Sequence, residues 1–348
     1  MKWFRTFLSV TTSLFIAFLG VLVLKWLHAP MPWLLGSILS MIIIGRFSSF
    51  PMASPKRLSA PSRAILGITI GSAFNPSTWH YLMDFIASLA LVFPFVIVVA
   101  VAGMWYYMNV LKFDVYTAYF SSMPGGLLEM ASLAESFPLD LYKVIITQAS
   151  RLLFMMLLFP FLIEWISHIP LDGRKGITQP LAQTNLYDMI WVFALAMLGW
   201  RIAARFKISG GTIIIPMLFG AVAYSTGLIH SRPPTELINL IQLILGTTIG
   251  FAFAGVSSKE MLKVFGQTSG YFVILMAVCF LFVGLVAWLT NFPLLSIVLA
   301  FAPGGQAEMN LIAIVVGANL PYVALHHILR LFLVLGISPV LIRFLRKP

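Results

Sequence analysis

The sequence contains few charged residues, a single cysteine and no nucleotide-binding motif. Asp, Glu, Lys and Arg together make up 9% of its 348 residues, whereas soluble domains carry about 25%, so an ordinary soluble protein is excluded. Cys279 is the one cysteine, which excludes a disulfide within the chain. No Gly-Lys dipeptide occurs, which excludes a P-loop and ATP-driven transport by this chain. The six histidines lack metal-ligand spacing, and we expect no catalytic site, no metal site and no cofactor.

Apolar residues dominate the rest of the chain. They make up 60% of it, and the mean hydropathy is +0.98. At about 20 residues per membrane-crossing helix, the chain has room for about ten such helices. The stretch 7–24 follows Lys2 and Arg5 as in a signal peptide, but no cleavage site follows, so we expect a retained helix. We therefore predict an all-α polytopic protein of the cytoplasmic (inner) membrane, whose basic residues set its orientation in the lipid bilayer and bind no nucleic acid.

The two halves of the chain are copies of one unit. A constant shift of 179 residues places 65–74 on 244–253 without a gap, and eight of these ten positions are identical. The same register joins residues of rarer types: Gly20 with Gly199, Pro124-Gly125-Gly126 with Pro303-Gly304-Gly305, Glu129 with Glu308, Arg151 with Arg330, and Pro160 with Pro339. Chance similarity between apolar segments would not keep one register through such residues. We predict repeat 1 over 1–167, a polar linker over 168–185 and repeat 2 over 186–348.

The orientation of the repeats depends on how often each one crosses the membrane. Each half contains six apolar segments, and the fifth carries the Pro-Gly-Gly sequence. If that segment is a re-entrant hairpin, the repeats are inverted, and an inside N-terminus leaves 16 Lys and Arg residues cytoplasmic and 4 outside. If all twelve segments cross, the repeats are parallel and the counts are 13 and 7. Because basic residues collect on the cytoplasmic side, we predict two inverted-topology repeats and a cytoplasmic N-terminus. Each repeat has about five transmembrane helices plus a broken helix or re-entrant hairpin.

Inverted repeats with interrupted helices are typical of secondary transporters, which bind their substrate at the interruptions. The interruptions are predicted at Pro124, Gly125 and Gly126 in repeat 1 and at Pro303, Gly304 and Gly305 in repeat 2. Each restarting segment begins with unpaired N–H groups and a positive dipole end, which favour an anionic group. We predict a substrate site at these residues; the alternative is a plain kink or tight turn in each helix.

Two carboxylates and two histidines are candidates for coupling transport to an ion. Glu129 and Glu308 follow the breaks by one helical turn, inside apolar segments. A carboxylate at that depth is costly, which favours a role in coupling to H⁺ or Na⁺; the alternative is a carboxylate solvated at the level of the lipid headgroups. His326 and His327 are candidates for a proton relay, although two histidines on a helix also serve as hydrogen-bonding partners.

Arg151 and Arg330 lie in the sixth apolar segment of each half. Gln148 lies one turn before Arg151, so that helix presents a polar stripe on one face. Because an arginine fork suits a carboxylate or phosphate on a solute, we assign Arg151, Arg330 and Gln148 to substrate binding. A fixed salt bridge from each arginine to Glu129 or Glu308 is the structural alternative.

Four motifs resemble the AbrB-type membrane proteins, a duplicated family with members labelled ammonia monooxygenase-like or regulator of gene expression. The motifs are 122–130, 302–309, 148–151 with its copy ending at Arg330, and 211–217. The resemblance covers nearly the whole chain and implies a duplicated integral membrane protein. A monooxygenase would need a metal or flavin site, and the sequence has neither ligand clusters nor a dinucleotide fingerprint. A regulatory role of relatives can arise indirectly, through the level of a transported metabolite.

From these features we predict a secondary transporter, and no enzyme, that carries a small anionic organic solute. Two other interpretations stay open: a membrane-embedded sensor or regulator of gene expression that carries no flux, and an integral membrane oxygenase. We expect the solute and the lipid bilayer as partners. A homodimer is left open, since the sequence shows no interface signature.

Overall fold

The computed structural model describes residues 2–47, 51–74, 83–126, 130, 133–135, 137–168, 171, 178–253 and 258–345. The chain is 80% helical, and its described residues form thirteen α-helices and no β-strand. Six of the described helices are long and apolar enough to cross a membrane, and four further apolar helices are 10–17 residues long. The prediction of an all-α polytopic membrane protein is therefore confirmed.

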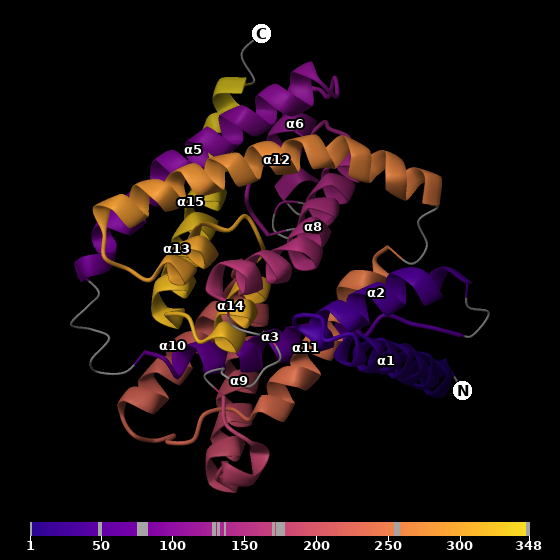
Figure 1. The fold of residues 1–348 in the computed structure, drawn as a ribbon, viewed down its shortest axis with the longest axis vertical. Helices are drawn as coiled ribbons and strands as arrows, with labels where there is room; N and C mark the ends of the chain where they lie inside the picture. Colours follow the sequence, from indigo (N-terminus) through magenta and orange to yellow (C-terminus); the bar gives the residue numbers. More distant parts are fainter. Residues whose placement is uncertain are drawn as a thin grey trace. The chain divides into compact units, whose positions relative to one another are not determined.

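The helices follow the apolar segments of the sequence (Figure 1). The first half contains α1 (Lys2–Trp26), α2 (Pro32–Phe47), α3 (Lys56–Gly71), the 3₁₀ helix η1 (Met83–Phe85), α5 (Ile86–Asn109), α6 (Val115–Ser122) and α8 (Leu141–Ser167). The second half contains α9 (Leu186–Phe206), α10 (Gly211–Ser225), α11 (Thr235–Phe251), α12 (Ser258–Leu289), α13 (Leu294–Phe301), α14 (Gln306–Val316) and α15 (Leu320–Leu345). The predicted linker 168–185 holds the short 3₁₀ helix η2 (Leu181–Gln183), while its residues 169–170 and 172–177 lie outside the described residues.

The shift of 179 residues also relates the helix boundaries. When α6 is moved by 179 residues it falls on α13 at both ends, and the first residues of α2, α3 and α8 fall on the first residues of α10, α11 and α15. Helix ends depend largely on local signals such as proline and glycine. The duplicated sequence therefore produces the same helices twice.

The described helices form two compact units, and each unit takes helices from both repeats. Unit 1 consists of 1–76, 159–258 and 314–317, so it contains α1–α3 together with α9–α11. Unit 2 consists of 77–158, 259–313 and 318–348, so it contains α5, α6, α12, α13, α15 and most of α8 and α14. The first three helices of each repeat are thus grouped apart from the later ones.

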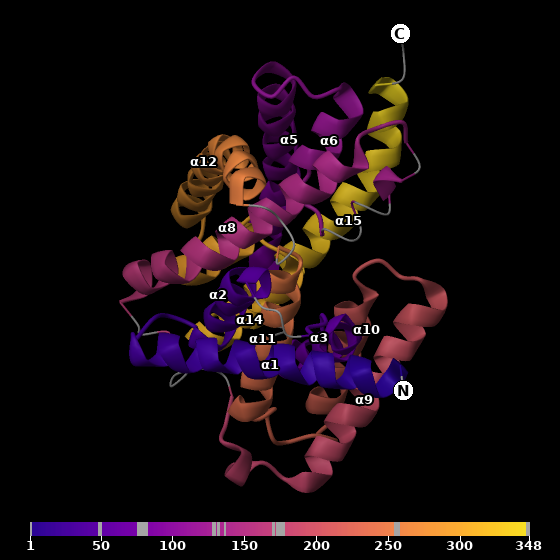
Figure 2. The same cartoon turned by 90° about the vertical axis from the view of Figure 1, so that its right-hand side faces the viewer.

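Within unit 1, two helix pairs are equivalent: α3 packs against α10, and α11 packs against α2. Glycine permits each close approach, because a Cβ atom on Gly67 would collide with the Ile213 carbonyl oxygen and one on Gly246 with the Leu34 carbonyl oxygen. The 179-residue shift carries Gly67 onto Gly246 and Leu34 onto Ile213. The repeats therefore pack against each other reciprocally, and Figure 2 shows α3 beside α10.

Candidate functional site

Both predicted Pro-Gly-Gly breaks interrupt a helix, and both lie in unit 2. In repeat 1, α6 ends at Ser122 and residues 123–126 are not helical. In repeat 2, α13 ends at Phe301 and α14 begins at Gln306. The interruptions are thus confirmed in both repeats, with Pro124, Gly125, Gly126, Pro303, Gly304 and Gly305 in the non-helical stretches.

Each break is held by the arginine of its own repeat. Arg151 donates from Nη1 to the Met123 carbonyl oxygen at 2.8 Å and from Nη2 to the Gly125 carbonyl oxygen at 2.9 Å. Arg330 makes the equivalent hydrogen bonds, both at 2.6 Å, to the carbonyl oxygens of residues 302 and 304. A helix that ends leaves carbonyl groups without partners and a negative dipole end, and a cation satisfies both. Both arginines therefore stabilise the ends of α6 and α13.

Gln148 and His327 add a second support at equivalent positions. Gln148 donates from Nε2 to the carbonyl oxygens of Phe120 at 2.7 Å and Met123 at 3.0 Å. His327 Nε2 lies 2.9 Å from the Leu299 carbonyl oxygen, and its Nδ1 lies 2.7 Å from Nη2 of Arg330. Because a guanidinium only donates, Nδ1 accepts and Nε2 carries the hydrogen that goes to Leu299. The ring therefore links Arg330 to the end of α13 in its neutral form.

Glu308 lies in the first turn of α14 and is 5% exposed. Its carboxylate folds back toward Gly305, where it occupies the space that a Cβ atom would take. This position places a negative charge at the positive end of the helix dipole. Among the described residues no Lys or Arg nitrogen lies within 4.0 Å of this carboxylate, so Arg330 and Glu308 form no salt bridge there. Glu129, its counterpart, lies outside the described residues.

His326 belongs to a separate buried network. Its Nδ1 donates to the Tyr322 carbonyl oxygen at 2.7 Å, and its Nε2 lies 2.7 Å from the Ser88 hydroxyl, which also contacts the Tyr322 hydroxyl. Since Nδ1 carries the hydrogen in the neutral ring, Nε2 accepts from Ser88. The network joins α5 of repeat 1 to α15 of repeat 2, and all its members lie in unit 2.

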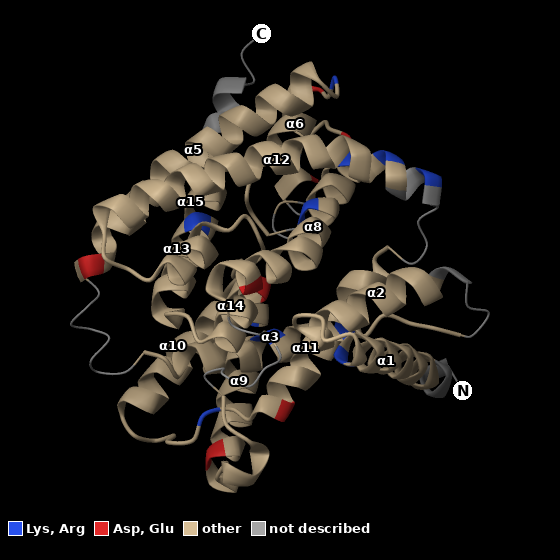
Figure 3. Cartoon of the chain, in the orientation of Figure 1, with Lys and Arg blue, Asp and Glu red and all other residues tan. Residues whose placement is uncertain are grey.

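Charged residues are sparse on the helices (Figure 3), and the two buried arginines have no carboxylate partner in the described part of the chain. Arg151 is 1% and Arg330 is 4% exposed, and Arg330 is near enough to Arg151 to interact with its charge. Burying an unpaired charge is costly. The surroundings of the breaks therefore favour an anion.

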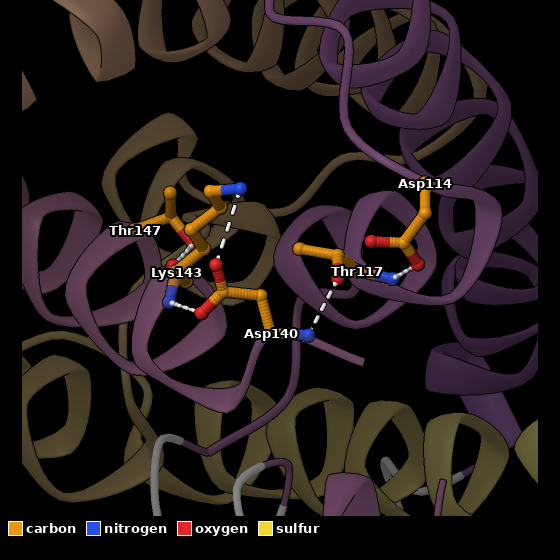
Figure 4. A network of polar contacts seen from close by, with 5 residues as sticks. All are labelled: Asp114, Thr117, Asp140, Lys143 and Thr147. Carbon is orange, nitrogen blue, oxygen red and sulfur yellow. Dashed lines mark hydrogen bonds and ion pairs between the residues drawn. The ribbon is translucent and has the colours of Figure 1, made fainter. Parts of the chain in front are cut away.

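Polar contacts join the start of α6 to the start of α8 (Figure 4). Asp114 accepts a hydrogen bond from the Thr117 backbone N–H at 2.9 Å, and Asp140 donates from its own backbone N–H to the Thr117 hydroxyl at 3.0 Å. The Asp140 carboxylate accepts from the Lys143 backbone N–H at 3.2 Å, and this hydrogen bond lowers the pKa of Asp140 below its ordinary value. These capping contacts set where both helices begin.

Sequence reasoning missed several polar residues of this region. Tyr271 donates its hydroxyl to the Ser122 carbonyl oxygen at 2.6 Å, at the last residue of α6. Ser88 and Tyr322 hold His326, and Asn310 of α14 is fully buried with its Oδ1 lacking a hydrogen-bond partner among the described residues. A comparison of the repeats position by position would have singled out Tyr271, since Val92 is its counterpart. The described residues bring no three His, Cys, Asp or Glu side chains together as a metal site.

Comparisons with known proteins agree with the helical membrane architecture. The sequence model described as "Transition state regulatory protein AbrB" matches residues 33–346. A Bacillus subtilis (strain 168) protein named "Uncharacterized protein YhjN" is 28% identical over 308 residues, which cover 83% of this chain and 79% of that protein. An Escherichia coli (strain K12) protein named "Putative regulator AbrB" is 26% identical over 334 residues, which cover 91% of each chain. No solved structure matches the chain.

Proposed function

The chain belongs to the AbrB family, and from that premise and the geometry of the two breaks we propose that it is a secondary transporter of a small organic anion. One observation carries the proposal. Two buried arginines, at equivalent positions of a duplicated unit, lie at interrupted helices and have no carboxylate partner among the described residues. Interrupted helices in repeated membrane folds expose backbone groups that bind substrate.

The charge at the breaks selects the solute. Arg151 and Arg330 use Nη1 and Nη2 to hold backbone carbonyls, so their net positive charge is not cancelled by these contacts. The first N–H groups of α14 add a positive dipole end beside them. An anion reduces the cost of burying these charges, whereas a cation increases it.

Glu308 is the coupling residue of this proposal, together with Glu129. The Glu308 carboxylate already places a negative charge at the start of α14, where an anionic solute would otherwise bind. The solute and an ionised Glu308 repel each other there, so binding of a proton or of Na⁺ by the carboxylate favours binding of the solute. This linkage couples the solute to H⁺ or Na⁺.

Alternating access follows from the proposed topology. We take the two repeats as inverted, with the N-terminus in the cytoplasm and the protein in the cytoplasmic membrane. Unit 2 carries both breaks, and unit 1 carries the reciprocal helix pairs. In the transport cycle, unit 2 moves as a body against unit 1 and carries the solute with it.

The test is uptake by the purified protein in sealed proteoliposomes. Radiolabelled organic anions are offered with an inward H⁺ gradient, an inward Na⁺ gradient or no gradient. We expect accumulation of at least one anion under one gradient only, and at least about tenfold less with Arg151→Met or Arg330→Met protein that remains folded. Anion binding without uptake under any gradient would overturn the proposal.

The printed name of the Escherichia coli relative favours a second candidate, a membrane-embedded regulator that affects gene expression without flux. Such a protein would bind the same anion at the breaks and pass the signal to a partner. The same proteoliposomes separate the candidates, because a regulator shows saturable binding and no accumulation.

A further inference from the structure

The two breaks match in backbone contacts, but their polar surroundings differ. Four buried hydroxyl residues near the first break have apolar residues at the positions related by 179: Ser121 with Ala300, Ser150 with Leu329, Thr268 with Leu89, and Tyr271 with Val92. Chemically equal breaks would carry equal surroundings in a duplicated chain. The first break is therefore the polar one.

Several polar atoms near the first break are buried without a hydrogen-bond partner among the described residues. They are Oε1 of Gln148, Nε of Arg151, Oγ of Ser121, Oγ of Ser150 and Oγ1 of Thr268. Gln148 is 1% exposed, as are Arg151 and Ser121. Native proteins pair nearly all buried polar atoms, with protein or with a bound molecule. A group of unpaired atoms at one place indicates a guest.

Gln148 and Arg151 aim their unpaired atoms at one place. Nε2 of Gln148 and Nη1 of Arg151 donate to the same oxygen, the Met123 carbonyl, at 3.0 and 2.8 Å. Oε1 of Gln148 and Nε of Arg151 are therefore within a few bond lengths of each other's side chain. Ser121 is adjacent, since its peptide bond carries the Phe120 carbonyl oxygen that Gln148 also holds at 2.7 Å. The site offers an acceptor, a charged donor and a hydroxyl.

The second break offers no such pair of atoms. Its acceptor, Nδ1 of His327, already receives a hydrogen bond from Nη2 of Arg330 at 2.7 Å. Ala300 stands where the first break has Ser121, and it adds no hydroxyl. Recognition of a polar group therefore falls to the first break alone.

We infer that the first break binds the polar end of the solute, and that the solute is a small carboxylic acid with a hydroxyl group on the adjacent carbon. This inference rests on the proposed function, which supplies an anionic solute. A carboxylate oxygen accepts from the Nε–H of Arg151 and from the Ser121 hydroxyl, and the solute hydroxyl donates to Oε1 of Gln148. An ammonium group could also donate to Gln148, but it would add a positive charge beside Arg151. The site therefore prefers hydroxy acids to amino acids.

The test is binding of matched acids to the full-length protein in detergent, by isothermal titration calorimetry. Two series of equal carbon skeleton serve as probes: lactate, propionate and alanine, and 2-hydroxyisocaproate, isocaproate and leucine. In at least one series we expect the hydroxy acid to bind about tenfold or more tightly than both analogues, because the analogue lacking the hydroxyl leaves Gln148 Oε1 unpaired. No binding by any probe, or no preference for a hydroxy acid, overturns the inference.

Two variants install residues of the second break in the first. Gln148→His supplies a ring whose Nδ1 pairs with Arg151, as His327 pairs with Arg330, so the free acceptor disappears. Ser121→Ala is independent and removes one hydroxyl with little risk to folding. We expect the preference for the hydroxy acid to fall toward one with Gln148→His and by several-fold with Ser121→Ala. Ala300→Ser, the matched control at the second break, leaves it unchanged; a preference that survives both variants contradicts the inference.

Binding in detergent needs no transport, so this result is separate from the uptake measurement. Hydroxy-acid preference without uptake keeps the binding site and removes the transporter. Uptake of anions without that preference keeps the transporter and removes the inference.

Discussion

Gln148 and His327 make the same contact in their two repeats: each donates from Nε2 to a carbonyl oxygen 28 residues earlier, at 2.7 and 2.9 Å. An amide and a neutral imidazole share this ability, because each presents one N–H donor and one acceptor at similar positions. The exchange of glutamine for histidine between the repeats therefore conserves the hydrogen bond to the broken helix.

This equivalence predicts that His327→Gln is tolerated and His327→Leu is not. Leucine leaves the Leu299 carbonyl oxygen and an Arg330 N–H buried without partners, at a cost of about 2–4 kcal/mol in the free energy of unfolding. Glutamine restores both contacts, and we expect a cost below about 1 kcal/mol. Denaturant unfolding in detergent micelles measures the difference. Equal destabilisation by the two variants would show that the ring contributes something other than these bonds.

Removing either guanidinium should destabilise the protein to a similar degree. Arg151→Met and Arg330→Met each leave two carbonyl oxygens of a break without donors, at a cost of about 2–5 kcal/mol. Arg330→Lys keeps one donor group but not the fork, so we expect an intermediate effect. The same unfolding measurement applies, and a cost under about 0.5 kcal/mol for both methionine variants would remove the arginines from the support of the breaks.

Glu308→Gln should separate solute binding from ion coupling. Glutamine keeps the size of the side chain, but neither a pH nor a Na⁺ gradient changes its charge. In proteoliposomes we expect accumulation against a gradient to disappear, while exchange of labelled for unlabelled solute continues. Glu164→Gln on α8 is the matched control for loss of one carboxylate. Gradient-driven accumulation by the Glu308→Gln protein would remove Glu308 from the coupling.

Gly67→Ala and Gly246→Ala should cost similar free energies, because the two glycines occupy reciprocal positions in unit 1. In each case the new Cβ atom meets a backbone carbonyl oxygen of the neighbouring helix, of Ile213 or of Leu34, and backbone cannot move away cheaply. We expect about 2–4 kcal/mol for each, as for overpacked cores. Gly284→Ala is the control: no heavy atom lies within 4 Å of its Cβ position, so alanine should be neutral or stabilise α12 by up to about 1 kcal/mol.

Asp140 should contribute stability at neutral pH that is lost in acid. Its pKa in the folded protein lies below the ordinary value because the Lys143 backbone N–H donates to the carboxylate. A lowered pKa means that the contribution is present above the unfolded pKa of about 3.9 and disappears as the pH falls through the folded pKa. Asp140→Asn should therefore lower the melting temperature slightly at pH 7 and not at pH values below both pKa values. A difference of equal size at both pH values would contradict this linkage.

The sequence alone determined the helical membrane class, the duplication and the positions of the breaks. These features depend on local or periodic signals: long apolar runs, proline and glycine at the breaks, and a register of 179 residues. Local signals act on neighbouring backbone, so they can be read without knowing the packing. For the same reason α6 and α13 end at equivalent residues.

Only the tertiary structure decided what the buried polar residues contact. From the sequence, Arg330 could pair with Glu308 or face a solute; in the structure its fork holds the carbonyl oxygens of Ala302 and Gly304. The grouping of α1–α3 with α9–α11, and the contact of Ser88 with His326 across 238 residues, were equally open. Such contacts join residues far apart in the chain, and they depend on which helix faces meet once the whole chain has packed, a relation that no local pattern records.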